Sequence, residues 1–92
     1  MKILLTERFQ KRVSKLSLDE RAKVFEALLG IPLALKNPHR HSGIGMRKLH
    51  KSGIYEVRIG LGLRLVFAFR NRELMLAMVG SHDDVRKYLA GL

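Results

Sequence analysis

Apolar and polar residues alternate along the second half of the chain, a pattern typical of half-buried β-strands. Residues 54 to 60 and 63 to 70 each place a row of apolar side chains on one side, formed by Tyr55, Val57 and Ile59 and by Leu63, Leu65, Phe67 and Phe69. Residues 73 to 79 are apolar on both sides, which indicates a covered strand. Tight turns at 60 to 62 and at 71 to 72 join these segments. The pattern therefore predicts three consecutive strands.

The first half of the chain is patterned for helices after a short apolar strand at residues 1 to 5. Thr6 is placed to cap a helix whose apolar stripe is formed by Phe9, Val13 and Leu16. Ser17 is followed three residues later by Glu20, which is the spacing of a capping box. This signature opens a second helix, for which we expect a buried face of Val24, Phe25, Leu28 and Leu29.

The remaining segments connect or end these elements. Gly30 and Pro32 predict a kink or an interruption in the second helix. Residues 38 to 53 contain glycines and no hydrophobic period, so we expect a loop or a twisted strand edge there. Ser81 and Asp84 again have the spacing of a capping box, which predicts a short C-terminal helix.

With 92 residues, these elements fit one domain with a single core. Their order predicts an α+β fold, in which an N-terminal strand and a two-helix hairpin pack on a mostly antiparallel four-stranded sheet. If the apolar faces of the strands meet the helices, their polar faces must share the opposite side. We expect that open sheet surface to carry Glu56, Arg58, Arg64 and Arg70.

The positive charge of the chain indicates which class of partner it binds. Lys and Arg outnumber Asp and Glu by eighteen to eight, and residues 36 to 72 alone hold nine basic residues and one acid. A field of this density attracts polyanions, nucleic acid first. An acidic protein partner or a merely solvated basic surface would account for the same charge.

Composition also excludes several classes. The chain has no cysteine, which excludes disulfide and thiolate chemistry and fits a cytoplasmic protein. No apolar run reaches the roughly 18 residues that span a bilayer, so we expect no membrane partner. The histidines are not accompanied by clustered carboxylates, and we therefore expect no metal and no cofactor.

A basic sheet face beside a histidine has the parts to cleave RNA without a metal. Cations stabilise the charge that develops on the phosphorane, and an imidazole suits proton transfer near neutral pH. His82 follows the last predicted strand directly and is the candidate for that transfer. Because helix capping is the alternative explanation for a polar residue at this point, the two roles stay open.

The segments IYEVRIGLGLRLVFAF and LAMVGSHDDVRKYL resemble the RelE/ParE superfamily of toxins. The resemblance covers nearly the whole chain and implies a RelE-like mRNA endoribonuclease that associates with the ribosome and inhibits translation. It also implies a cognate antitoxin protein as a partner, beside mRNA and the ribosome. Two alternatives remain, which are a ParE-like inhibitor of DNA gyrase without nuclease activity and a noncatalytic RNA-binding or ribosome-binding module.

The resemblance also assigns residues. It implies that Arg64 stabilises the scissile phosphate, that Arg58 faces the RNA and that His82 transfers a proton. Tyr88 matches a tyrosine that positions the nucleotide in some members, although packing explains it equally well. Glu56 stands where the family has lysine, and it could act as a base, pair with Arg58 or moderate the charge. Further RNA contacts are expected from Arg47, Lys48, His50, Lys51, Arg70 and Arg86.

Overall fold

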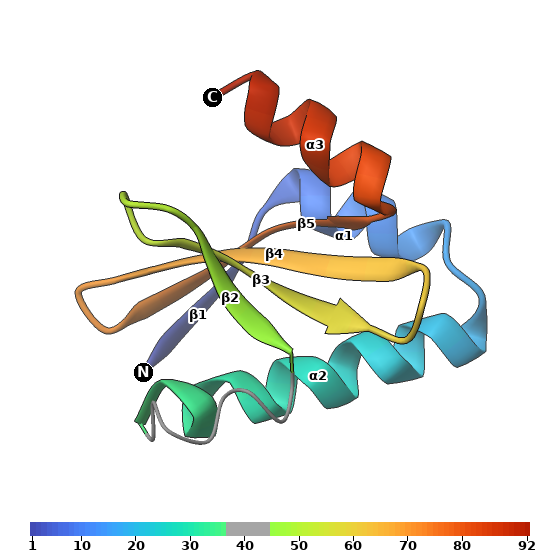
Figure 1. The fold of residues 1–92 in the computed structure, drawn as a ribbon. Helices are drawn as coiled ribbons and strands as arrows, with labels where there is room; N and C mark the ends of the chain where they lie inside the picture. The colour runs from blue at the N-terminus through green and yellow to red at the C-terminus, as the bar shows by residue number, and fades with distance from the viewer. Residues whose placement is uncertain (37–44) are drawn as a thin grey trace.

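The computed structural model describes residues 1–36 and 45–92 and has the expected α+β architecture (Figure 1). In chain order its elements are β1 (Lys2–Leu5), α1 (Glu7–Ser14), α2 (Leu18–Lys36), β2 (Met46–His50), β3 (Ile54–Ile59), β4 (Leu63–Arg70), β5 (Glu73–Gly80) and α3 (His82–Ala90). The three predicted C-terminal strands and the final helix are confirmed within one or two residues. Both capping boxes are also confirmed, since Ser17 and Glu20 exchange hydrogen bonds, as do Ser81 and Asp84.

The strands form one five-stranded sheet in the order β1-β5-β4-β3-β2. β1 runs parallel to β5, and every other neighbouring pair is antiparallel. The prediction of four strands was therefore wrong by one, because β2 forms inside the segment expected to be a loop or strand edge. Residues 46 to 50 lack an apolar alternation because this edge strand buries only Met46 well. His39 and His41 lie outside the described residues.

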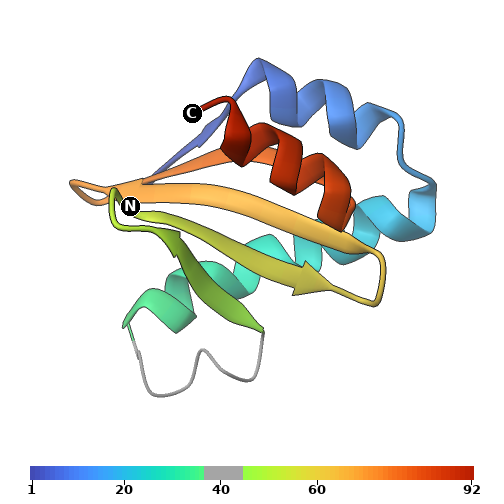
Figure 2. The ribbon, with the colours of Figure 1, turned by 45° about the horizontal axis from the view of Figure 1, so that its top comes forward.

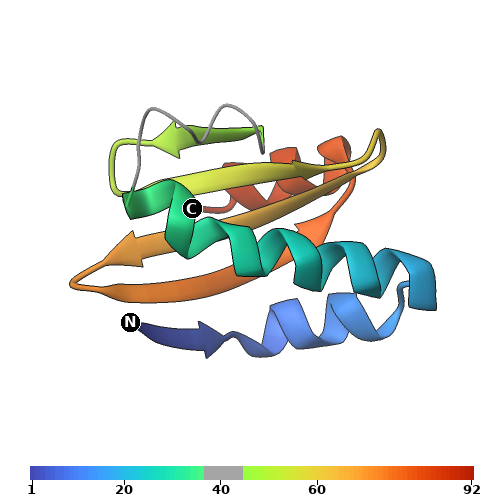
Figure 3. The ribbon, with the colours of Figure 1, turned by 90° about the horizontal axis from the view of Figure 1, so that it is seen from below.

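One face of the sheet packs on α2 and forms the main core (Figure 3). The apolar rows predicted for β3 and β4 both point to this side, where the rings of Tyr55 and Phe67 stack with centroids 5.4 Å apart. From α2, this core receives Val24 and Ile31. The predicted buried face of this helix was correct for Val24 and wrong for Leu29, which is 76% exposed.

α2 differs from its sequence prediction in two respects. Its apolar residues surround the helix, so the pattern did not define a single buried face, and Phe25 is exposed together with Leu29. The helix also continues through Gly30 and Pro32 to Lys36 instead of being interrupted. Packing of Ile31 and Ala34 against the core offsets the backbone hydrogen bond that proline removes. No helix in the described part of the chain is long and apolar enough to cross a membrane.

The opposite face of the sheet is partly covered by α3, which packs a smaller cluster against it. This cluster buries Val66, Ala77, Met78 and Val85. The prediction of a fully open surface was therefore wrong, because the C-terminal helix folds back over β4 and β5 (Figure 2). Leu49 of β2 and Ile54 of β3 also pack against this cluster, and charged side chains occupy the rest of the face on these two strands.

α1 lies along the edge of β5 and completes its hydrogen bonding where β1 has ended (Figure 2). The Thr6 hydroxyl, which caps α1, donates to the carbonyl oxygens of Leu76 and Ala77 at 2.8 and 3.0 Å. Further along, Arg12 Nε donates to the Val79 carbonyl at 2.9 Å. Side chains of a helix thus take the place that a neighbouring strand would occupy.

Candidate functional site

Two arginines face each other across the centre of the candidate site. Arg58 on β3 and Arg64 on β4 are direct register partners, so their side chains leave the same face of the sheet. The row continues to Gly80 on β5, and at the other end Gly45 lies against Arg58. Since neither glycine carries a side chain, the arginine pair is not covered along its own row.

A buried carboxylate lies beside this pair. Glu56 is 2% exposed, and its oxygens accept hydrogen bonds from Arg47 Nε at 2.7 Å and from Arg64 Nη1 at 3.2 and 3.3 Å. Instead of projecting from an open surface, Glu56 is enclosed by the two guanidinium groups. Of the three roles considered for it, ion pairing is present, although its partners are Arg47 and Arg64 rather than Arg58.

The three arginines differ in how much of each remains accessible. The Arg64 side chain is 17% exposed, whereas that of Arg47 is 64% exposed. Arg58 is also exposed. Because like charges directly opposite each other repel, the Glu56 carboxylate also stabilises the close approach of the arginines. The result is a compact cationic cluster with one internal counter-charge.

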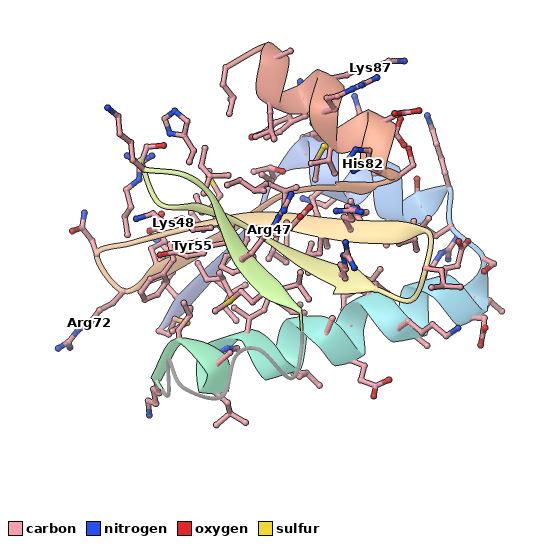
Figure 4. All side chains as sticks on the ribbon, in the orientation of Figure 1. Arg47, Lys48, Tyr55, Arg72, His82 and Lys87 are labelled. Atoms are coloured by element: carbon pink, nitrogen blue, oxygen red, sulfur yellow. The ribbon has the colours of Figure 1, made fainter. Side chains whose placement is uncertain are left out.

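His82 is the first residue of α3 and is exposed at the border of this cluster. Ser81 is the helix cap, so the capping explanation for His82 is wrong. Arg64 pairs with Gly80, which is only two residues before His82, so α3 begins at the same end of the sheet as the arginine pair. Figure 4 shows His82 at the start of α3 and Arg47 on the edge strand β2.

The start of α3 is fixed by contacts that the sequence did not reveal. Asp84 pairs with Arg12 Nη2 of α1 at 2.7 Å and accepts the Ser81 backbone N–H at 2.9 Å. A Cβ at Gly80 would come within 2.8 Å of the Asp84 Cβ and 2.6 Å of the Arg12 guanidinium, so glycine is what allows this approach. These contacts fix the backbone from which the His82 side chain projects.

The pKa of Asp84 is lowered from its ordinary value of 3.8. The largest cause is the hydrogen bond from the Ser81 backbone, followed by the Ser81 hydroxyl, with smaller contributions from the charges of Arg12 and Lys87. Asp84 consequently stays ionised at neutral pH and keeps the first turn of α3 attached to α1.

The predicted RNA-contact residues of the β2 region are divided between the two faces of the sheet. Arg47 pairs with Glu56 in register, whereas Lys48 pairs with Tyr55, whose ring belongs to the core on the α2 side. Figure 4 shows Arg47 and Lys48 leaving β2 on different sides. His50 contacts Ser52 through Nδ1 at 2.6 Å, and Lys51 is in the adjoining turn, away from His82.

The other predicted residues also lie apart from the arginine pair. Arg70 is on the same strand as Arg64 but six residues away, which is about 20 Å along a strand. Arg86 is exposed on α3 and pairs with Asp83 at 3.5 Å. Tyr88 faces α1, where the Arg8 guanidinium lies 5.0 Å from its ring centroid. The compact site is therefore formed by Arg47, Glu56, Arg58, Arg64 and His82.

Comparisons with known proteins were made by sequence and by structure. No protein-family model matches the chain, and no curated protein matches it in sequence. A copper-bound mutant toxin from Helicobacter pylori is similar in structure with a TM-score of 0.73 and 27% identity, over 92% of this chain and 98% of that one.

Two RelE structures are also similar. A mutant of E. coli toxin RelE in the free state gives a TM-score of 0.70 at 21% identity, over 96% of this chain and 90% of that one. Archaeal RelE from the Pyrococcus horikoshii RelE-RelB complex gives 0.67 at 13% identity, over 87% and 92%. The resemblance seen in the sequence is thereby confirmed at the level of the fold, which the chain shares with these toxins.

Proposed function

We propose that the protein is a metal-independent endoribonuclease that cleaves mRNA as the toxin of a toxin-antitoxin system. The observation that carries the proposal is the cross-strand pair of Arg58 and Arg64 beside an exposed His82. Two guanidinium groups can bind and neutralise a phosphodiester, and an imidazole at their border can transfer a proton in the same reaction.

The residues have separate roles in this proposal. Arg58 and Arg64 stabilise the negative charge that develops on the phosphorane during attack by the ribose 2′-OH. The attacking 2′-OH loses its proton to water, and His82 donates a proton to the leaving 5′ oxygen, a transfer for which an imidazole is suited. Glu56 holds Arg47 and Arg64 in place, since both of its oxygens are already occupied by guanidinium donors. Tyr88 takes no part at the reacting phosphate, because it faces α1.

The same proposal includes a cognate antitoxin and the ribosome as partners. RelE of Pyrococcus horikoshii and RelE and YafQ of E. coli were each solved in complex with an antitoxin. A chain with a net charge of +10 suits an antitoxin whose binding segment is acidic, and the same charge suits ribosomal RNA. We place the activity in the cytoplasm, where mRNA and ribosomes are found.

The test is cleavage of a defined mRNA by the purified protein, with and without ribosomes, in the presence of EDTA. We expect products ending in 2′,3′-cyclic phosphate or 3′-phosphate. His82→Ala should lower the cleavage rate by about 10²- to 10⁴-fold, the usual contribution of a general acid. Arg72→Ala, at the exposed β4–β5 turn far from the site, is the matched control and should cleave like the original protein.

A noncatalytic RNA-binding module is a second candidate, favoured by one observation. The Arg64 side chain is only 17% exposed and its guanidinium already donates to Glu56, which limits what it can offer a phosphate. In that case His82→Ala would weaken RNA binding slightly and the intact protein would leave mRNA uncut. Uncut mRNA together with gyrase-dependent DNA breaks would instead contradict both candidates and favour the ParE-like function.

A further inference from the structure

A second basic surface lies in the groove between α1 and α3, outside the compact site. A cavity of about 360 Å³ opens there, and its lining includes Arg8, Arg12, Asp84, Lys87 and Tyr88. The sequence concentrates positive charge in residues 36 to 72, so neither this groove nor its α1 residues were expected to bind a ligand. Figure 2 shows α1 and α3 side by side above the sheet.

The charges of the groove do not cancel. Asp84 is the acidic side chain of the lining, which also includes Leu92, and Asp84 is already bound to Arg12 and to the Ser81 N–H. Arg8 and Lys87 form no ion pair with any carboxylate of the described residues. Lys15 extends the same side of α1 and lines an adjoining hollow together with Arg8 and Arg12. The groove therefore offers an excess of positive charge to a ligand.

Arg8 is also oriented by an aromatic ring. Its guanidinium carbon lies 5.0 Å from the centroid of Tyr88, within the range of a cation–π contact. Arg8 is exposed, while Tyr88 packs against the small cluster under α3. A planar guanidinium held over a tyrosine ring leaves its outer side available, and nucleobases stack on such planes.

The groove opens beside the first turn of α3, the helix that begins with His82. Asp84 and Arg12 lie at the end where α3 begins, two residues from His82. Tyr88 and Arg8 lie further along the same helix, six residues and about 9 Å of helix beyond His82. His82 is not in the lining of the groove, so a strand bound at both places has to pass around the first turn of α3.

We propose that the α1–α3 groove binds the RNA strand next to the scissile bond, with Arg8 and Lys87 on phosphates and a base stacked on Arg8. This proposal rests on the proposed function for the identity of its ligand. Stacking on a planar cation does not depend on the base, so the groove adds affinity without sequence preference. An acidic peptide would use the same charges, although it has no planar group to place on the Arg8–Tyr88 pair.

The test compares RNA binding by the full chain and by the double variant Arg8→Ala/Lys87→Ala. The probes are a trinucleotide that covers the scissile bond and a labelled twelve-nucleotide RNA, both with a 2′-deoxy block at the cleavage site. For the longer RNA we expect the Kd to rise about tenfold in the double variant, the loss of roughly one stacked base. The slope of log K against log salt concentration should become less steep by about 1.4, because two phosphate contacts are lost and each contributes about 0.7 on a single strand.

Binding of the trinucleotide should change less in this variant than binding of the longer RNA, since the trinucleotide has fewer phosphates to place on Arg8 and Lys87. The control is Lys2→Ala/Arg72→Ala, which removes one lysine and one arginine from exposed positions at the opposite end of the sheet. It should lose less affinity and keep most of the salt dependence. Circular dichroism and thermal unfolding confirm that each variant is folded.

Equal losses in the double variant and the control would overturn the groove proposal, because nonspecific charge would then explain both. Unchanged RNA binding with lost binding of a polyglutamate probe would overturn it as well and make the groove a protein site. If the double variant behaves as expected while His82→Ala leaves cleavage intact, the groove stands and the proposed catalytic role of His82 fails.

Discussion

The two faces of the sheet are built from the same strands and differ in what they bury. The face under α2 encloses a continuous apolar core around Leu65 and Phe67. The face under α3 encloses a small cluster around Val66 and leaves the rest to Arg58 and the ion pairs of Glu56. Because successive side chains of a strand point to opposite sides, one segment of sequence supplies both surfaces.

This difference separates stability from chemistry. An apolar core stabilises the fold in proportion to the surface it removes from water. A buried ion pair adds little net stability, because the free energy needed to remove both charges from water offsets their attraction. The charged face therefore contributes less to folding, and what it provides is a fixed arrangement of cations. The variants below change one face at a time and measure both properties.

The largest effect is expected on the α2 face. Phe67→Ala removes a fully buried ring that stacks on Tyr55, and it should lower the free energy of unfolding by about 3–5 kcal/mol. Val66 is the neighbouring residue on the α3 face. Val66→Ala should lower the free energy of unfolding clearly less, because valine has a smaller side chain and the cluster around it has few members. Chemical denaturation of both variants tests this, and equal losses would mean that the α3 face carries as much stability as the main core.

A smaller loss of stability, with a gain in binding, is expected from Glu56→Gln. Losing this carboxylate leaves Arg47 and Arg64 without their counter-charge. Breaking a fully buried ion pair lowers the free energy of unfolding by about 3–5 kcal/mol, and the loss here should be smaller because Arg47 reaches water. Both guanidinium groups then become available to phosphate, so RNA should bind more tightly.

The same variant also decides between two roles of Glu56. If its carboxylate only positions the arginines, cleavage of bound RNA should continue in Glu56→Gln. Tighter binding with cleavage abolished would instead show that Glu56 acts as a base, one of the roles that its sequence position left open. Denaturation, RNA titration and single-turnover cleavage on one preparation separate these results.

The smallest effect concerns the support of His82. Asp84→Asn should lower the free energy of unfolding at pH 7 by at most about 1 kcal/mol, the range of a partly exposed ion pair. Since the folded state lowers the pKa of Asp84, its contribution is full above the unfolded value of 3.8 and is lost as the pH falls through the lower folded value. The difference between the two proteins should therefore vanish in acid, and a difference that persists at pH 2 would contradict this assignment.

Much of the fold could be predicted from local patterns. Alternation located β3 and β4, and the Ser17–Glu20 and Ser81–Asp84 spacings located the starts of α2 and α3. These signals are local because each arises from strand geometry or from a helix terminus. β2 and the exposed side of α2 could not be assigned, since an edge strand has no full alternation and an all-round apolar helix has no defined stripe.

The candidate site was predicted in part. Arg58, Arg64 and His82 followed from the strand pattern and the resemblance, and the register places them at one end of the sheet. The partners of Glu56 and the separation of Tyr88, Lys48 and Arg70 from His82 did not follow. Each depends on which element folds onto which face, and spacing along the chain does not contain that information.

The sequence by itself determined the alternation, the helix starts and the excess of positive charge, because these depend on residues a few positions apart. The tertiary structure alone decided that Glu56 is buried between two arginines and that Arg12 of α1 holds the start of α3 through Asp84. Those contacts join segments up to 72 residues apart, and they form only when α1 takes the edge of β5 and α3 folds back over the sheet.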